Sequence, residues 1–263
     1  EKSELSKESA LEVIDPYTEQ VVAYVDQASP QQMKKAIEAS IEAFQNMRKT
    51  SRYLRSRLLA TIADLIATNR EAFTNIISNE SGKPVSTADV EITRAINTFR
   101  VCSEECKRIG GEIVPLDTDP GGRAYGNARV VLEPRGPILG ITPFNFPLNL
   151  VAHKVAPALA SGCSILIKPA PQAPGAAVLL GRLFLEACDV VGDLEERPSK
   201  AGFQVLSCSN DVASIAVKDS RLNTLSFTGS TKVGWLLQEH AIKKKVLLEL
   251  GGNAAVIIAA DAN

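Results

Sequence analysis

From residue 138 to the end of the chain, short apolar runs alternate with segments of helical periodicity. The runs 138–141, 164–168, 203–208, 222–227, 246–249 and 254–259 predict strands, and the segments 148–159, 176–188, 211–218 and 231–242 predict helices. Connections of this length are typical of right-handed crossovers between parallel strands. The sequence therefore predicts an α/β fold with a mostly parallel sheet and helices on both faces.

The first 110 residues have a different pattern, which is mainly helical. Apolar runs within 13–25 flank a turn signal and predict a hairpin, and helices are expected over 30–48, 54–69, 70–80 and 86–107. Ser29 and Pro30 form an N-cap signal at the start of the first helix. The glycine- and proline-rich stretch 110–122 predicts irregular backbone, and 128–133 predicts a strand.

Composition excludes several classes of protein. The 263 residues carry 29 Lys and Arg against 30 Asp and Glu, so the net charge of −1 favours neither nucleic-acid nor membrane-surface binding. The uncharged window 136–152 holds three prolines and is expected to be buried backbone, not a membrane span. Five irregularly spaced cysteines, with no N-terminal export signal, favour a reducing, cytoplasmic location over a disulfide scaffold. No Cys and His spacing predicts a metal site.

Two candidate segments follow predicted strands, where parallel sheets bind ligands. In Thr142–Pro147, two prolines stiffen the loop that carries Asn145, whose amide suits an oxyanion hole; the alternative is a structural loop. Lys168, at the end of its strand, is placed to bind a ribose or a phosphate. A solvated strand-end lysine is the alternative for that residue.

Two further segments follow the last strands. Phe227–Gly234 joins a strand to a helix, and Gly229 with the free N–H groups at the helix start favours an anion such as pyrophosphate. An ordinary capped turn is the alternative. Glu249 stands between an apolar run and two glycines, where partial desolvation would suit a general base. The alternative is a strand-end glutamate in water.

In order and separation, these segments resemble motifs of the aldehyde dehydrogenase superfamily. Its Pro-Trp-Asn-Phe-Pro loop is similar to 142–147, with Phe144 in place of Trp, and its Lys-Pro-Ser/Ala-Glu segment is similar to 168–171. Phe-Thr-Gly-Ser-Thr-x-Val-Gly is matched by 227–234, and Leu-Glu-Leu-Gly-Gly by 248–252. The Asp15-Pro16-x-Thr18 and Ser81–Pro84 segments also fit, so the resemblance covers nearly the whole chain.

The resemblance implies a Rossmann-like domain that binds NAD or NADP in an enzyme oxidising an aldehyde to an acid through a cysteine thioester. Asn145 would stabilise the oxyanion, Glu249 would be the general base, Lys168 would contact the adenosine ribose, and Gly229 and Ser230 would lie along the pyrophosphate. The implied cofactor-binding residues are Thr142, Pro143, Phe144, Lys168, Ala170, Pro171, Phe227, Gly229, Ser230, Val233, Leu250 and Gly251.

Three departures from the family pattern qualify this assignment. No cysteine follows Leu248–Gly252 as in the family, so the nucleophile and its catalytic domain are expected outside this chain, which alone would be inactive. Pro171 replaces an acidic residue that would repel a 2′-phosphate, so NADP is tolerable. The stretch 207–210 lacks the customary glycine. A non-catalytic nucleotide-binding or assembly module is the alternative to the enzyme.

The resemblance also predicts a domain organisation. It comprises an N-terminal hairpin and helical part over 1–122, an oligomerisation hairpin over 123–140 and a Rossmann-like core over 141–263. The hairpin implies a homo-oligomer. The aldehyde itself is not specified by these residues.

Overall fold

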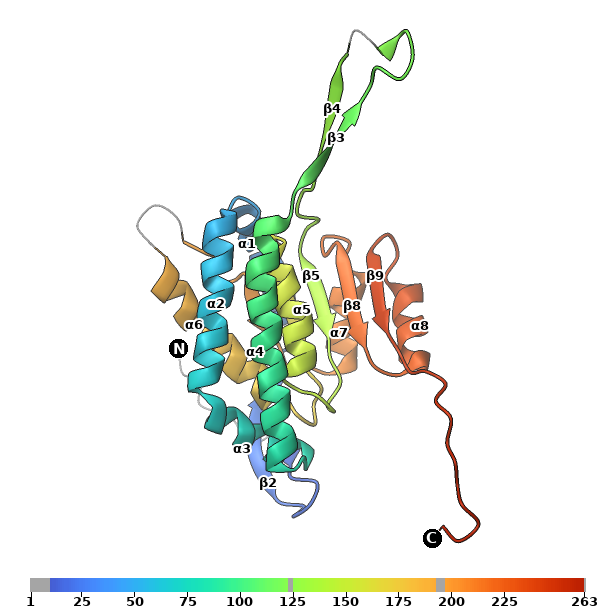
Figure 1. Cartoon of the computed structure of the whole chain (residues 1–263). Coiled ribbons are helices and arrows are strands. Elements are labelled where there is room, and N and C mark those ends of the chain that lie inside the picture. Colours follow the sequence, from blue (N-terminus) through green and yellow to red (C-terminus); the bar gives the residue numbers. More distant parts are fainter. Residues whose placement is uncertain (1–9, 123–124, 193–196, 263) are drawn as a thin grey trace.

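The computed structural model describes residues 10–122, 125–192 and 197–262. At its centre lies a parallel five-stranded sheet in the order β7-β6-β5-β8-β9 (Figure 1). The strands are β5 (Ile138–Ile141), β6 (Ile165–Lys168), β7 (Phe203–Val205), β8 (Thr224–Thr228) and β9 (Lys245–Glu249). The predicted α/β fold with a parallel sheet is confirmed.

Helices cover both faces of this sheet. On one face lie α5 (Asn149–Ala160) and α6 (Gly175–Val191); on the other lie α1 (Pro30–Met47), α7 (Asn210–Lys218) and α8 (Thr231–His240). Strand β6 shows why both layers are needed. Ile165 and Ile167 pack into the core with α5 and α6, whereas Leu166 packs into the core with α1 and α7. Successive residues of a strand point to opposite faces, so this strand is buried on both sides.

The N-terminal part confirms the predicted hairpin and helices. β1 (Ala10–Ile14) pairs with β2 (Val21–Asp26), and Ser29 caps α1 in a capping box with Gln32. The remaining helices are α2 (Arg52–Thr68), α3 (Arg70–Ser81) and α4 (Val85–Arg108). They pack on α5 and α6 and share their hydrophobic core. Residues 1–9, where an export signal would be sought, lie outside the described residues.

A two-stranded arm extends away from this body (Figure 1). It consists of β3 (Gly111–Pro115) and β4 (Asn127–Val131), which pair antiparallel from Gly111 with Val131 to Pro115 with Asn127. The prediction of irregular backbone was therefore wrong for 111–115. Flanking glycines and a proline hide this strand locally, and its pairing with β4 stabilises it. Of the hairpin predicted over 123–140, residues 123 and 124 lie outside the described residues, and β5 belongs to the main sheet.

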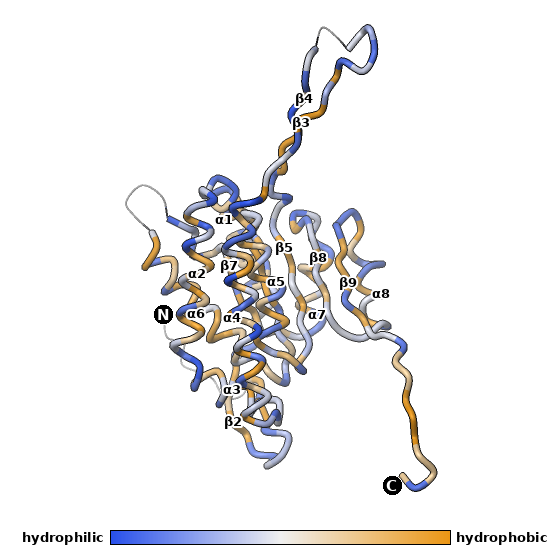
Figure 2. Tube along the Cα trace, viewed as in Figure 1, coloured by the Kyte–Doolittle hydropathy of each residue, from blue (hydrophilic) through white to orange (hydrophobic). Residues whose placement is uncertain are grey.

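The predicted strand over 254–259 is wrong. Residues 251–259 form no strand and are exposed, and Val256, Ile257 and Ile258 are bare to solvent. Figure 2 shows this apolar tail leading away from β9, the edge strand of the sheet. A strand needs a neighbour for its backbone hydrogen bonds, and none of the described strands pairs with this segment. Within the described ranges, no helix is long and apolar enough to cross a bilayer.

Candidate functional site

The predicted segments leave the sheet at one edge. Because the strands are parallel, the residues that follow β5, β6, β8 and β9 emerge together at the carboxyl edge. The N–H of Thr142 donates to the carbonyl of Lys168 at 3.2 Å, and the N–H of Gly229 donates to the carbonyl of Glu249 at 3.0 Å. The four segments thus form two hydrogen-bonded pairs along the same edge.

A cavity of about 290 Å³ opens between α7 and α8 at this edge. Most of its wall is aliphatic, and Lys168 and Val233 line it together with Ile141, Ala213, Leu236 and Leu237. Polar residues complete the lining, among them Asp211 and His240. A cavity with a largely apolar wall and a few polar groups suits a flat heteroaromatic ring attached to a polar sugar. Two of the sequence-predicted binding residues, Lys168 and Val233, therefore share one cavity.

Lys168 is buried where its strand ends. Only 6% of the residue is exposed, and burial lowers the pKa of its ammonium, against the opposing effect of the nearby Cys208 thiol. The alternative of a solvated lysine is therefore wrong. Ala170 is buried as well, whereas Pro171 is exposed. The predicted contact of Lys168 with a ribose stays a prediction.

The Phe227–Gly234 turn is capped and requires glycine at one position. The hydroxyl of Ser230 accepts the N–H of Val233 at 3.4 Å and caps α8. A Cβ on Gly229 would lie 2.5 Å from Cζ of the Phe227 ring, which folds beneath the turn. This side of the turn therefore has no room for a side chain. The backbone N–H groups at the start of α8 are therefore not covered by a side chain at position 229. Uncovered N–H groups at a helix N-terminus favour an anion.

Asn145 is exposed in the loop between β5 and α5, and a lysine holds its backbone. The ammonium of Lys83 donates to the Asn145 carbonyl at 2.7 Å and lies 4.1 Å from the centre of the Phe146 ring. Phe144 is about half exposed. The sequence analysis attributed the order of this loop to its prolines. It named Ser81–Pro84 as a segment that fits the family but assigned Lys83 no contact with the loop, because a lysine between a glycine and a proline carries no local signal for a partner 62 positions away.

Glu249 is exposed at the end of edge strand β9. The expected partial desolvation is wrong, and the alternative of a strand-end glutamate in water describes this residue. Its side chain and Leu250 border a cavity of about 540 Å³, whose wall also includes Lys154, Ser226 and Thr228. The exposure follows from its place on the strand, because Lys245, Leu247 and Glu249 alternate along β9 and all three are exposed, so this face of the strand is open to solvent.

Lys154 is a site residue that the sequence analysis missed. It projects from α5 and donates to the hydroxyls of Ser226 at 3.0 Å and Thr228 at 2.9 Å. Burial lowers the pKa of its ammonium to about 8, although the charge of Glu249 acts in the opposite direction. The signal was present in the sequence, since Lys154 is the one charged residue in the apolar segment 149–160.

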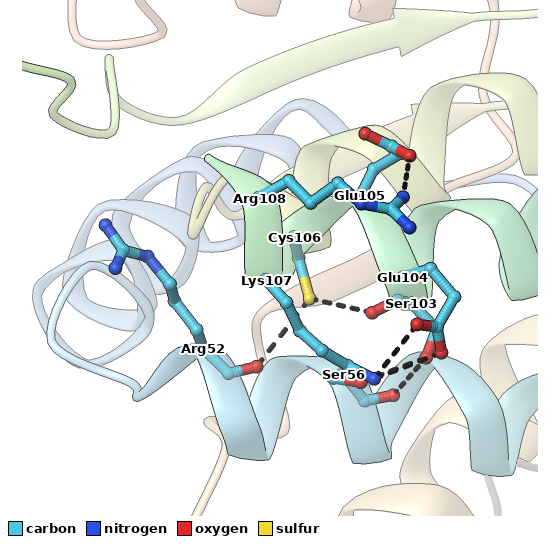
Figure 3. A network of polar contacts seen from close by, with 8 residues as sticks. All are labelled: Arg52, Ser56, Ser103, Glu104, Glu105, Cys106, Lys107 and Arg108. Atoms are coloured by element: carbon cyan, nitrogen blue, oxygen red, sulfur yellow. Dashed lines mark hydrogen bonds and ion pairs between the residues drawn. The ribbon is translucent and has the colours of Figure 1, made fainter. Parts of the chain in front are cut away.

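Four of the five cysteines are buried, and Cys102 is partly so. The sulfur of Cys106 lies 3.6 Å from the Arg52 carbonyl oxygen and 3.2 Å from the Ser103 carbonyl oxygen, where α2 meets α4. Figure 3 shows these two contacts as dashed lines. Burial raises the pKa of this thiol and raises that of Cys188 to about 12. Within the described residues, no group of three His, Cys, Asp or Glu side chains could hold a metal ion.

Comparison with known proteins gives one consistent result. The model of the aldehyde dehydrogenase family matches residues 3–263. The 3-sulfolactaldehyde dehydrogenase of Priestia aryabhattai is 37% identical over 254 residues, which are 96% of this chain and 51% of that protein. The chain thus spans about half the length of the curated relatives it matches.

Solved structures agree with this match. Aldehyde dehydrogenase 21 of Physcomitrella patens, in complex with the reaction product succinate, is 39% identical with a TM-score of 0.85, over 93% of this chain and 49% of that one. Glyceraldehyde-3-phosphate dehydrogenase of Methanocaldococcus jannaschii, complexed with NADP, is 32% identical with a TM-score of 0.83, over 92% and 51%. This chain therefore belongs to the aldehyde dehydrogenase family.

Proposed function

We propose that this chain is the NAD(P)-binding part of an enzyme that oxidises an aldehyde to a carboxylic acid. The observation that carries the proposal is the arrangement at the carboxyl edge of the sheet. There the cavity between α7 and α8, the buried Lys168 and the Gly229 turn all lie at the carboxyl ends of neighbouring, hydrogen-bonded parallel strands. A largely apolar cavity, a buried ammonium and a helix N-terminus are groups that suit a dinucleotide.

Each part of the dinucleotide has a fitting partner. The adenine ring enters the cavity beside Val233, and the ammonium of Lys168 binds hydroxyls of the adenosine ribose. The N–H groups at Gly229 and Ser230 face the pyrophosphate. The remaining contacts are assigned to Thr142, Pro143, Phe144, Ala170, Pro171, Phe227, Leu250 and Gly251.

The bound dinucleotide supplies the acceptor for the hydride that leaves the aldehyde. The side-chain amide of Asn145 donates a hydrogen bond to the oxyanion formed at the aldehyde carbon, and the carboxylate of Glu249 takes the proton of the thiol or of the hydrolytic water. The nucleophile is a cysteine outside these 263 residues. Its absence here is supported by the raised pKa of the Cys102, Cys106, Cys188 and Cys208 thiols and by the burial of Cys163, which is 3% exposed.

Both NAD and NADP are expected to bind. Pro171 is exposed and uncharged three positions after Lys168, where a carboxylate would repel a 2′-phosphate. Position 171 therefore does not repel the 2′-phosphate of NADP, and the ammonium of Lys168 in the same cavity offsets the charge of Asp211.

The partners and location follow from the same features. The exposed apolar residues of the β3–β4 arm suit contact with a second copy of the chain, as in a homo-oligomer. The free thiols suit a reducing, cytoplasmic location.

A non-catalytic nucleotide-binding or assembly module is the second candidate function. The buried thiols of this chain are as compatible with that module as with an enzyme whose nucleophile lies elsewhere.

Calorimetric titration with NAD and NADP tests the proposal. Lys168→Met removes the ammonium, and Ser214→Phe fills the cavity between α7 and α8, so each should weaken binding by about tenfold. Lys35→Met, which changes an exposed lysine on α1, is the matched control and should bind as the unchanged chain does. Binding that neither variant weakens, in chains with an unchanged circular dichroism spectrum, would contradict the assignment. Aldehyde oxidation by the complete protein separates the enzyme from the non-catalytic module.

A further inference from the structure

Lys83 stands in a rigid connection between two helices. Gly82 ends α3 in the left-handed conformation, with φ of 65°, and its N–H donates to the Ser78 carbonyl at 2.9 Å. Pro84 then precedes the first turn of α4. The hydrogen bond to Ser78 holds Gly82 in a conformation that glycine adopts without strain, and Pro84 restricts the backbone of Lys83, the residue before it, so the position from which the Lys83 side chain extends is defined.

The ammonium of Lys83 joins three groups. It lies 2.5 Å from the Glu91 carboxylate, 2.7 Å from the Asn145 carbonyl and 4.1 Å from the centre of the Phe146 ring. Its side chain is only 11% exposed. Charge-assisted hydrogen bonds and a cation–π contact are stronger when water is excluded. This ammonium therefore restrains the loop between β5 and α5, which carries Asn145 and Phe146.

Glu91 connects the same ammonium to the start of α5. Its carboxylate is fully buried on α4, and the other oxygen accepts the N–H groups of Leu148 at 2.9 Å and Asn149 at 3.0 Å. One carboxylate thus holds the first turn of α5 and the lysine that holds Asn145. The middle of the loop between β5 and α5 and the start of α5 are therefore tied to a single ion pair.

We propose that Lys83 is a positioning residue that fixes Asn145 for its role toward the oxyanion, and this rests on the proposed function. Asn145 itself is exposed, and its backbone carbonyl is the atom that the ion pair holds. A donor to a developing oxyanion must be held within a fraction of an ångström. Releasing the carbonyl frees the backbone from which the amide extends, so Lys83 acts through Asn145 without contacting the substrate.

The first test measures the order of the loop in the 263-residue chain. In Lys83→Met, the order parameter of the Asn145 and Phe146 amides should fall from about 0.85 to below about 0.6, while Asn149 stays rigid. Arg70→Met breaks the Arg70–Asp89 pair between α3 and α4 and should leave the loop unchanged. If the single variant does not fold, Lys83→Met with Glu91→Gln removes both charges and keeps an oxygen for the α5 amides. An ordered Asn145 in Lys83→Met, or in the double variant where the single one does not fold, would overturn the proposal.

The second test is a double-mutant cycle in the complete enzyme. Lys83→Met should lower kcat by about tenfold to a hundredfold, with KM for the dinucleotide within about twofold. In an Asn145→Ala background the same change should cost nothing further, whereas Arg70→Met should act independently of Asn145. If the reductions in kcat caused by Lys83→Met and Asn145→Ala multiply in the double variant, the proposal is overturned. If the complete protein oxidises no aldehyde, the proposed function fails, and the order parameters alone decide the role of Lys83.

Discussion

The ammonium of Lys154 lies 2.9 Å from the hydroxyl oxygen of Thr228, the last residue of β8. The contact joins an apolar helix to the strand that leads into the Gly229 turn. Its partners are hydroxyl groups, which do not neutralise the charge, and burial therefore lowers the pKa of Lys154 to about 8. The charged form of this lysine is held at a cost to the stability of the fold.

This cost predicts a dependence of stability on alkaline pH. The unfolded chain holds the Lys154 proton up to about pH 10.5, and the folded chain releases it near pH 8, so the unfolded state binds more protons in between. The free energy of unfolding should rise by up to about 3 kcal/mol across this window because of Lys154. Urea titrations of Lys154→Met should lack this rise, whereas Lys232→Met should keep it. An identical pH profile for Lys154→Met and the unchanged chain would refute the shift.

Glu80 predicts the opposite trend at lower pH. Its carboxylate on α3 accepts the N–H of Gly175 at 2.9 Å, and burial raises its pKa to about 7. Between about pH 4.5 and 7 the folded chain holds a proton that the unfolded chain has lost, so stability falls as pH rises, by up to about 3 kcal/mol. Glu80→Gln keeps an acceptor for Gly175 and should remove this fall. Exposed Glu71 on the same helix offers the control, Glu71→Gln, which should leave the pH profile unchanged.

The fold was predictable where local periodicity and pairing agree. Strand β6 is a short apolar run stopped by Pro169, and α1 carries its cap in Ser29, so both could be located from the sequence. The arm strand 111–115 and the segment 254–259 gave the two errors. In both cases the outcome depends on whether a partner strand lies alongside, and hydropathy does not contain that information.

The site was predictable in its backbone and less so in its charges. Gly229 and Lys168 come from segments whose order along parallel strands places them at one edge. Glu249 was expected to be partly desolvated, but it lies on the exposed face of β9. Lys154 stands out as the one charged residue of an apolar segment, but Lys83 and Lys154 both contact residues more than sixty positions away, so no local pattern identifies their partners.

Gly229 and Gly252 provide a matched pair for dinucleotide binding. A Cβ at 229 would lie 2.5 Å from the Phe227 ring, whereas a Cβ at 252 would meet nothing within 4 Å. Gly229→Ala should therefore displace the turn and weaken NADP binding by about tenfold, and Gly252→Ala should bind normally. Calorimetry measures both affinities. Equal affinities for the two variants would show that the turn does not contact the dinucleotide.

The β3–β4 arm predicts self-association through its apolar side chains. Ile113 is 72% exposed on β3, and Leu132, just beyond β4, is 61% exposed. Burying such residues against a second copy removes apolar surface from water, whereas a carboxylate at either position would have to be desolvated. Ile113→Asp and Leu132→Asp should each shift the chain toward monomer in sedimentation velocity. Val101→Asp, at a 59% exposed position on α4, is the control and should leave the association unchanged. If all three variants sediment alike, the arm is not the contact surface.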